Sequence, residues 1–223
     1  MKTMKILIAM QAVHANDILK NMTREALGSI KSIHDWGVIV DSRDISLADK
    51  WNYALELGKN YDYTFLVNND ILFYEDTLDS VVEFMEKNRE YVFVSSNQIF
   101  EYEQLERPDG IDENKLHWSF VALRAKEVIE KIGLVDTIFE RGSFVDTEWE
   151  IRTRKLGLKM CRLLRSRFFH WNDSTHRLLP NYRDVFDSNN EKLIKKWGPG
   201  ASYSFPYNDS TLDIKFIGHG TKK

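Results

Sequence analysis

Apolar and polar residues follow one another along the first hundred positions in a way that predicts strands alternating with helices. Uninterrupted apolar runs predict strands over residues 4–10, 37–40, 63–67 and 91–95, and apolar residues at helical spacing predict helices over residues 17–33, 47–57 and 78–87. The strands are apolar on both faces, so we expect a mostly parallel α/β sheet that helices flank on both sides. In such sheets ligands bind beyond the carboxyl ends of the strands.

The pattern changes after residue 99. A polar stretch predicts a loop over residues 100–116, and beyond it the chain predicts a strand over 118–123, helices over 126–131 and 147–156, and extended segments over 158–164 and 167–171. The first half therefore has the pattern of a nucleotide-binding sheet, and the second half has the pattern of a specificity half joined to it.

The composition is that of a protein with a full-sized core and no strong charge field. Of the 223 residues, 43% are apolar, and the formal net charge is −3, so no global basic field attracts nucleic acid or acidic lipid. The single cysteine excludes an internal disulfide and fits a reducing compartment. Lys2 and Lys5 stand before an apolar run over residues 6–10, but that run is shorter than the core of a secretory signal, which has about 7 residues or more. We expect a soluble, cytoplasmic protein without a transmembrane segment.

Polar residues end two of the predicted strands. Asn68, Asn69 and Asp70 follow the strand over 63–67, and Asp41 follows the strand over 37–40. The cluster over 68–70 has two interpretations that spacing alone does not separate. It is a plain Asx turn, or Asp70 supplies an oxygen ligand to Mg²⁺ or Mn²⁺ while the amides hold sugar or phosphate groups.

A helix over 147–156 leaves one acid without a structural explanation. Glu148 and Arg152 form an i,i+4 pair, and Thr147 with Glu150 fits a capping box that starts the helix at Thr147. Asp146 stands one residue earlier. It is either the N-cap itself or a catalytic base that the positive end of the helix keeps ionised.

One histidine and two tryptophans complete the candidate residues. His170 follows two phenylalanines, which is typical of a half-buried structural histidine, but it also ends a late strand and could be a second ligand that suits Mn²⁺ better than Mg²⁺. Trp118 and Trp171 each stand beside a histidine, and we expect these two to stack on a sugar ring. No glycine-rich phosphate loop is present, which argues against a dinucleotide enzyme or an NTPase.

Taken in order, several segments resemble glycosyltransferase family 2, whose members are inverting enzymes with a GT-A fold. The segments are "SLADKWNYALELGKNYDYTFLVNNDILF", "WSFVALRAKEVIEKIGLVD", "FVDTEWEIRTRKLGLKM", "FFHWNDS" and "NNEKLIKKWG". The resemblance covers roughly residues 5–198. It implies one GT-A domain over 1–198, with a nucleotide-binding half over 1–99 and an acceptor half over 100–198, followed by a C-terminal extension over 199–223.

The resemblance also implies a role for each residue that matches the family's motifs. Asp146 stands at the family's general base. Asp70 stands at the metal-binding acid of the DxD turn, and His170 at the late histidine near the diphosphate and metal. The residues that match nucleotide-sugar contacts are Asp41, Asn52, Asn68, Asn69 and Arg152. Asn68 takes the place of the first acid of the turn, and the loop after the first strand lacks the family's usual residues.

The implied activity is transfer of a sugar from a nucleotide-diphosphate donor to an acceptor hydroxyl, with inversion and with Mn²⁺ or Mg²⁺ as cofactor. A glycan or another hydroxyl compound would be the acceptor; we expect no stable nucleic-acid binding, but a DNA acceptor and a homodimer stay open. Two alternatives remain. A nucleotidyltransferase would need a glycine-rich basic loop, which residues 11–20 do not supply, and a non-catalytic sugar-nucleotide or glycan-binding module would follow if Asp146 were only a helix cap.

Overall fold

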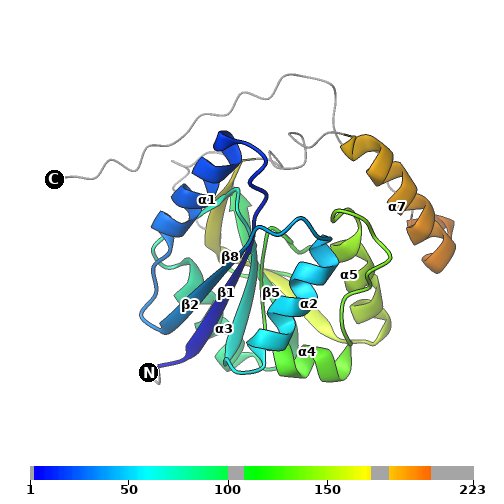
Figure 1. The fold of residues 1–223 in the computed structure, drawn as a ribbon. Helices are drawn as coiled ribbons and strands as arrows, with labels where there is room; N and C mark the ends of the chain where they lie inside the picture. The colour runs from blue at the N-terminus through cyan, green and yellow to red at the C-terminus, as the bar shows by residue number, and fades with distance from the viewer. Residues whose placement is uncertain (1–2, 100–107, 172–180, 202–223) are drawn as a thin grey trace.

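A central sheet with helices on both faces organises the chain (Figure 1). The computed structural model describes residues 3–99, 108–171 and 181–201. The strands are β1 (Lys5–Gln11), β2 (Asp35–Asp41), β3 (Tyr63–Asn68), β4 (Ile71–Phe73), β5 (Tyr91–Ile99), β6 (Ile111–Asp112), β7 (Phe120–Leu123) and β8 (Lys159–His170). The helices are α1 (Asp17–Ser29), α2 (Leu47–Gly58), α3 (Thr77–Lys87), α4 (Ala125–Lys131), α5 (Val145–Lys155) and α7 (Tyr182–Trp197), with a short 3₁₀ helix, η1, over Pro199–Ala201.

The sheet is mixed but mostly parallel. Its strands lie in the order β2-β1-β3-β7-β5-β8-β4, and β6 pairs with β8. The pairs β1–β2, β1–β3 and β5–β8 are parallel, whereas β7 runs antiparallel to both β3 and β5. Consequently β1, β2, β3, β5 and β8 point the same way, so their carboxyl ends lie at one edge. The expected α/β class, with a mostly parallel sheet between helices, is confirmed.

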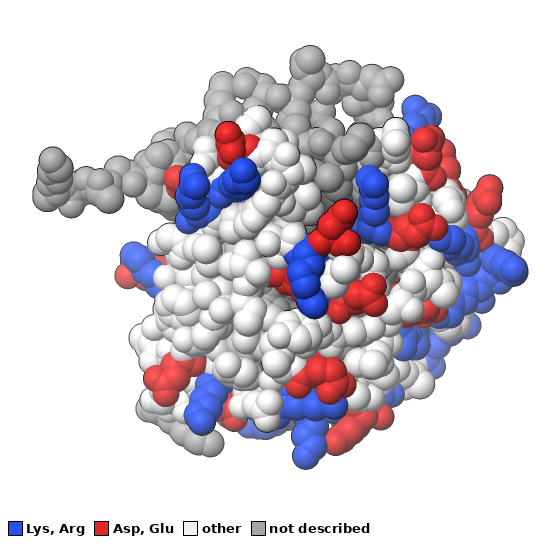
Figure 2. All heavy atoms as spheres, in the orientation of Figure 1, with Lys and Arg blue, Asp and Glu red and all other residues white. Residues whose placement is uncertain are grey.

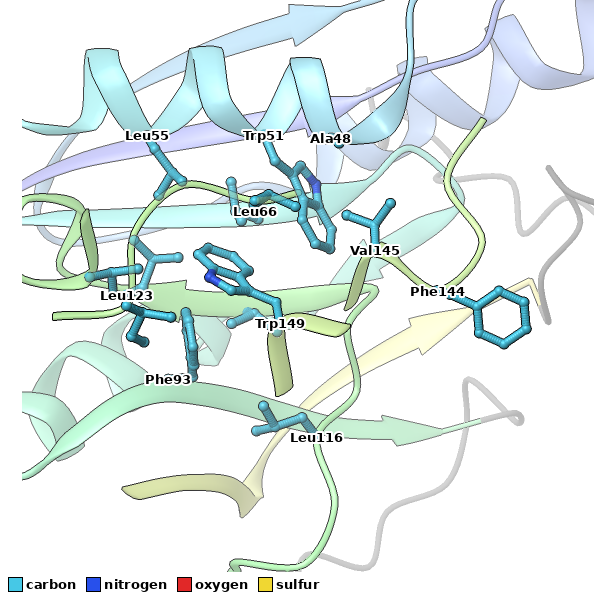
Figure 3. Packing of buried hydrophobic residues seen from close by; sticks show 14 of the residues in the cluster. Ala48, Trp51, Leu55, Leu66, Phe93, Leu116, Leu123, Phe144, Val145 and Trp149 are labelled. Carbon is cyan, nitrogen blue, oxygen red and sulfur yellow. The ribbon is translucent and has the colours of Figure 1, made fainter. Parts of the chain in front are cut away.

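Each face of the sheet has its own buried cluster. On one face, side chains of α2, α4, α5 and α7 belong to one cluster. Trp51 and Trp149 lie in it with ring centroids 6.0 Å apart, close to Leu66 and Phe93 of the sheet (Figure 3). On the other face, α1 and α3 cover a cluster that includes Phe65, Phe120 and Phe168. Lys and Arg side chains mix with Asp and Glu on the face shown in Figure 2, in keeping with the small net charge.

Most predicted elements are confirmed, but the boundaries of several are wrong. Helix α2 matches the prediction within one residue, whereas α1 ends at Ser29 instead of residue 33, because Ile30 is extended and Ser29 turns its hydroxyl to the backbone of Ala26. The two extended segments after residue 158 form one strand, β8, whose pairing with β5 is irregular after Leu163. Strands β4 and β6 and helix α7 were not predicted.

The missed helix α7 has a physical explanation. Its buried positions, Tyr182, Phe186, Asn189 and Leu193, recur at helical spacing, but one of them is an asparagine and the rest of the helix is polar. Hydrophobic periodicity therefore gives only a weak signal for a helix in this segment, although one side of α7 is buried in the folded protein.

Candidate functional site

Three neighbouring parallel strands end in polar side chains at the same edge of the sheet. Strand β1 lies between β2 and β3, and the register places Gln11 beside Asp41 on one side and beside Asn68 on the other. Side chains alternate between faces along a strand, and Ala9 packs in the cluster under α2, so Gln11 points to that face as well. Asp41, Gln11 and Asn68 thus form a row at the carboxyl edge, on the side of α2.

Two cations that the sequence analysis did not single out stand beside Asp41. Arg43 donates from Nε to Oδ1 of Asp41 at 2.9 Å and from Nη2 to Oδ2 at 2.5 Å, and this pairing holds the pKa of Asp41 below its ordinary value. Lys50, near the start of α2, is 6% exposed and donates to the carbonyl of Ala12 at 3.0 Å. Burial lowers the pKa of Lys50, and the charge of Asp41 opposes that shift. The carboxylate of Asp41 is therefore already engaged by Arg43. The ammonium group of Lys50 has three N–H donors, one of which binds the carbonyl of Ala12.

Gln11 was also missed, although it occupies the centre of the row. Its side chain is 6% exposed, and its Nε2 donates to the carbonyl of Ala9 at 3.2 Å. Within the part of the chain that the structure describes, its Oε1 is buried and has no hydrogen-bond partner. A buried acceptor without a donor is costly to folding, so it is a signal of function that only the structure carries.

The two polar residues after β3 contact different elements: Asn69 contacts α1, and Asp70 contacts β8. Asn69 is 1% exposed and donates from Nδ2 to the carbonyl of Leu19 at 3.3 Å and to Oγ1 of Thr23 at 3.1 Å, so it ties β3 to α1. Asp70 turns to β8 instead. Its Oδ1 lies 3.2 Å from Nε2 of His170, and both side chains are 1% exposed. The chain brings these two predicted metal ligands together because Ile71, next to Asp70, pairs with His170 in the antiparallel β4–β8 ladder.

Asp70 and His170 form a close carboxylate–imidazole pair. A carboxylate oxygen and an imidazole nitrogen 3.2 Å apart are compatible with neighbouring ligands of one ion, since each would lie about 2.1 Å from it. Among the described residues no group of three or more His, Cys, Asp and Glu side chains gathers to hold an ion. The binding of Mn²⁺ or Mg²⁺ by Asp70 and His170 stays a prediction.

His117 lies near this pair and was not predicted. Nη1 of Arg162 is 2.6 Å from Nε2 of His117, and Nη2 of Arg162 is 2.6 Å from Oδ2 of Asp112. Arginine only donates, so Nε2 of His117 accepts and its proton resides on Nδ1. Burial, with the charges of Arg162, Lys115 and His170, lowers the pKa of His117 to about 4, which keeps this ring neutral at physiological pH.

Asp146 is the second residue of α5, not a residue before it. The helix begins at Val145 with Phe144 as N-cap, in a left-handed conformation (φ 66°) and without a side-chain cap bond. The capping box of Thr147 and Glu150 is therefore wrong, and so is the alternative of Asp146 as N-cap. Packing explains the earlier start, because the ring of Phe144 is buried and lies 4.7 Å from that of Phe186.

The carboxyl group of Asp146 has a raised pKa. The residue is partly buried, and its Oδ1 accepts from the backbone N–H of Thr147 at 2.8 Å. Burial raises the pKa of Asp146 to about 6, with a further contribution from Glu150, although the bond from Thr147 opposes the shift. A carboxylate with a pKa near 6 is ionised at neutral pH and is a better proton acceptor than an ordinary aspartate.

The two tryptophans predicted to stack on sugar have different surroundings. Trp118 is partly buried, packs 5.9 Å from Trp51 and Trp149, and donates from Nε1 to Oε2 of Glu150 at 3.0 Å. Trp171 is 6% exposed and belongs to a small buried cluster under α1. Of the two, Trp118 has the more exposed position, and the sugar-stacking role of both stays a prediction.

Asn52 and Arg152 hold one segment of backbone. Asn52 donates to the carbonyl of Val135 at 3.0 Å and accepts from its N–H at 2.8 Å. Arg152 donates to the carbonyls of Ile132 and Leu134 at 3.1 and 2.8 Å and to Oε2 of Glu148 at 2.9 Å. These bonds give both residues a structural role, and their contact with a nucleotide sugar stays a prediction.

Short connections link the strand ends to α5. The N–H of Asn68 donates to the carbonyl of Ser119, and the preceding residue, Trp118, bonds Glu150 on α5. The start of α5 also meets the start of α2, since a Cβ on Gly142 would lie 3.1 Å from Leu47. Asp146 therefore lies at the same end of the sheet as the row of Asp41, Gln11 and Asn68 and the pair of Asp70 and His170.

Comparisons with known proteins add little to this geometry. No protein-family profile matches the sequence, and no curated protein does. The solved chains that match include the crystal structure of A197 from STIV, with a TM-score of 0.46 and 15% identity over 78% of this chain and 87% of that chain. This likeness is too distant to carry an argument about function. In the described parts of the chain, no helix is both long and apolar enough to cross a membrane.

Proposed function

We propose that the protein is an inverting glycosyltransferase that moves a sugar from a nucleotide-diphosphate donor to an acceptor hydroxyl, with Asp146 as general base. The observation that carries the proposal is the setting of Asp146, whose pKa is raised to about 6 at the end of the sheet where ligands of α/β proteins bind. The order of motifs that resemble glycosyltransferase family 2 supports the same assignment.

The donor would lie across the carboxyl ends of β1, β2 and β3. The buried Oε1 of Gln11 accepts a hydrogen bond from an N–H or O–H group of the nucleotide. The remaining N–H groups of Lys50 donate hydrogen bonds to oxygen atoms of the nucleotide. Asn68 completes the row. Asp70 and His170 would hold Mn²⁺ or Mg²⁺ together with the diphosphate, and the bound cation would offset the negative charge of the leaving group.

The reaction is a single displacement. The acceptor oxygen forms a bond to the anomeric carbon while the bond from that carbon to the diphosphate oxygen breaks, and the nucleoside diphosphate leaves with the electron pair. The carboxylate of Asp146 takes the proton of the attacking hydroxyl. A positioned base of this kind contributes about 10²–10⁴-fold to the rate.

A hydrolysis screen tests this function. UDP-, GDP- and dTDP-sugars are incubated with Mn²⁺ or Mg²⁺, and release of nucleoside diphosphate is compared for wild type, Asp146→Asn and Asp70→Asn. The matched control is Asp17→Asn, since Asp17 is also in the first turn of a helix but its side chain is 93% exposed. We expect one donor to be hydrolysed, a loss of about 10²-fold or more in Asp146→Asn, and no change in Asp17→Asn.

Other outcomes would replace the proposal. Release of inorganic pyrophosphate from a nucleoside triphosphate and a sugar phosphate would indicate a nucleotidyltransferase. Binding of a sugar nucleotide that is never turned over, with the same affinity in Asp146→Asn, would indicate a binding module.

A further inference from the structure

The segment just before Asp146 has an unusual backbone. Between Glu140 and Val145, Arg141, Gly142 and Phe144 all have positive φ, at 53°, 132° and 66°. Residues other than glycine rarely adopt such values, and they persist only where the surrounding structure enforces them. Phe144 is the N-cap of α5, and its carbonyl accepts the N–H of Glu148 at 2.9 Å, so the helix start depends on this conformation.

One buried side chain of α7 holds this segment through its backbone. Asn189 is fully buried; its Oδ1 accepts from the N–H of Glu140 at 3.0 Å, and its Nδ2 donates to the carbonyl of Glu140 at 2.8 Å. A longer contact of 3.4 Å joins Nδ2 to the carbonyl of Ser143. The amide therefore satisfies both ends of the segment, which no apolar residue of similar size could do.

Other contacts between α7 and the same region support this clamp. The hydroxyl of Ser143 donates to the hydroxyl of Tyr182 at 3.0 Å, and Lys192 reaches Oε1 of Glu140 at 2.7 Å. Phe186 packs on Phe144. Tyr182 and Phe186 precede Asn189 on α7 and Lys192 follows it, so the amide lies in the middle of the contact between α7 and residues 140–144.

We propose that Asn189 is a positioning residue, whose amide fixes residues 140–144 and thereby sets where α5 begins and where the carboxylate of Asp146 stands. The inference rests on the proposed function in that Asp146 is taken as the base. Loss of the amide would let residues 140–144 relax, move Asp146 and admit water to its carboxyl group. An ordinary pKa and a slower reaction would follow, since misplacing a catalytic group by about 1 Å can cost on the order of 10²-fold in rate.

The test combines a measurement on Asp146 itself with kinetics. The carboxyl carbon of Asp146 is titrated by ¹³C NMR in wild type, Asn189→Leu and the milder Asn189→Ser, which keeps one hydroxyl and covers the case in which the leucine variant does not fold. The control is Ser188→Leu, at an exposed position one residue away on α7. We expect the Asn189 variants to move the pKa of Asp146 down from about 6 by at least about half a unit. We also expect kcat for donor turnover to fall about tenfold or more, with the donor KM within about twofold.

The outcomes separate this inference from the proposed function. The Asn189 variants could have a lower melting temperature but an unchanged pKa of Asp146 and an unchanged fall of kcat at acidic pH. That result would overturn the inference and leave Asn189 as a stabilising residue only. If wild type turns over no donor, the proposed function fails, but the NMR titration still decides whether Asn189 positions Asp146.

Discussion

At the scale of single residues, the carboxyl group of Asp146 lowers the stability of the protein at neutral pH, where the proposed reaction needs it ionised. Its pKa is about 6 in the folded protein and about 3.9 in an unfolded chain. The pKa of Asp146 is higher in the folded than in the unfolded chain, so the protonated carboxyl group favours folding. This contribution to stability is complete at a pH below the unfolded-state pKa and is lost as the pH rises through about 6. At neutral pH the ionised group therefore opposes folding, by at most about 3 kcal/mol and by about 1–2 kcal/mol once its partial exposure is taken into account.

Replacement of Asp146 by asparagine should thus stabilise the protein while it removes activity. We expect Asp146→Asn to raise the free energy of unfolding by about 1–2 kcal/mol at pH 7.5 and by almost nothing near pH 3.8, because asparagine still accepts the N–H of Thr147 but carries no charge. Urea unfolding at the two pH values measures the difference. An equal effect at both values, or a loss of stability at pH 7.5, would contradict the raised pKa.

Gln11 offers a second test at this scale, because its Oε1 is buried without a partner in the described chain. Gln11→Met removes that acceptor at similar length, so stability should stay the same or rise by up to about 1 kcal/mol. Affinity for the nucleoside diphosphate, measured by calorimetry, should fall. The contrasting variant is Asn52→Leu, in which an amide with two backbone bonds to Val135 is lost; we expect a loss of about 2 kcal/mol there. A comparable loss in Gln11→Met would mean that its amide is structural.

At the scale of elements, the start of α5 depends on Gly142. Its φ of 132° disfavours any side chain, and a Cβ would lie 3.1 Å from two carbons of Leu47 at the start of α2. We expect Gly142→Ala to lower the free energy of unfolding by about 1–3 kcal/mol, measured by chemical denaturation. Gly28→Ala is the matched control, because Gly28 lies in α1 with open space around it, and alanine there should stabilise by up to about 1 kcal/mol. Equal effects in the two variants would show that the turn adapts to a side chain.

Elements also show what local sequence encodes and what it leaves out. Apolar runs predict β2 and β3, and the polar residues that follow these two runs, Asp41 and Asn68, predict side chains at the carboxyl edge, because both are properties of neighbouring positions. The partners of other residues come from far along the chain. Asp70 meets His170 a hundred residues later, and Asn189 holds a carbonyl 49 residues earlier. The start of α5 follows the same logic, since burial of Phe144 against α7 prevails over the capping box that the local sequence favours.

At the scale of the whole molecule, ion pairs around one buried carboxylate join three parts of the chain. Glu148 of α5 is fully buried and accepts from Arg152 at 2.9 Å and from Lys196 of α7 at 2.7 Å. Lys196 also reaches Asp136, in the segment between α4 and α5, at 2.5 Å. The side chain of Glu148 is 0% exposed, whereas those of Arg152 and Lys196 are 23% and 33% exposed. Removal of Glu148 therefore takes two charge-assisted hydrogen bonds from inside the protein, which is more costly than the loss of a surface ion pair.

This arrangement predicts that one substitution weakens the packing of α7 on the rest of the protein. We expect Glu148→Ala to lower the free energy of unfolding by about 2 kcal/mol, whereas Glu83→Ala, which removes a surface partner of Lys87, should cost about 0.5 kcal/mol or less. Hydrogen exchange locates the effect: amides of α7 and α5 should lose protection before those of β1 and β3. Because α7 holds the residues before Asp146, the same variant should also lower donor turnover. Uniform loss of protection over all elements would show that Glu148 stabilises the molecule as one unit and that α7 does not open independently.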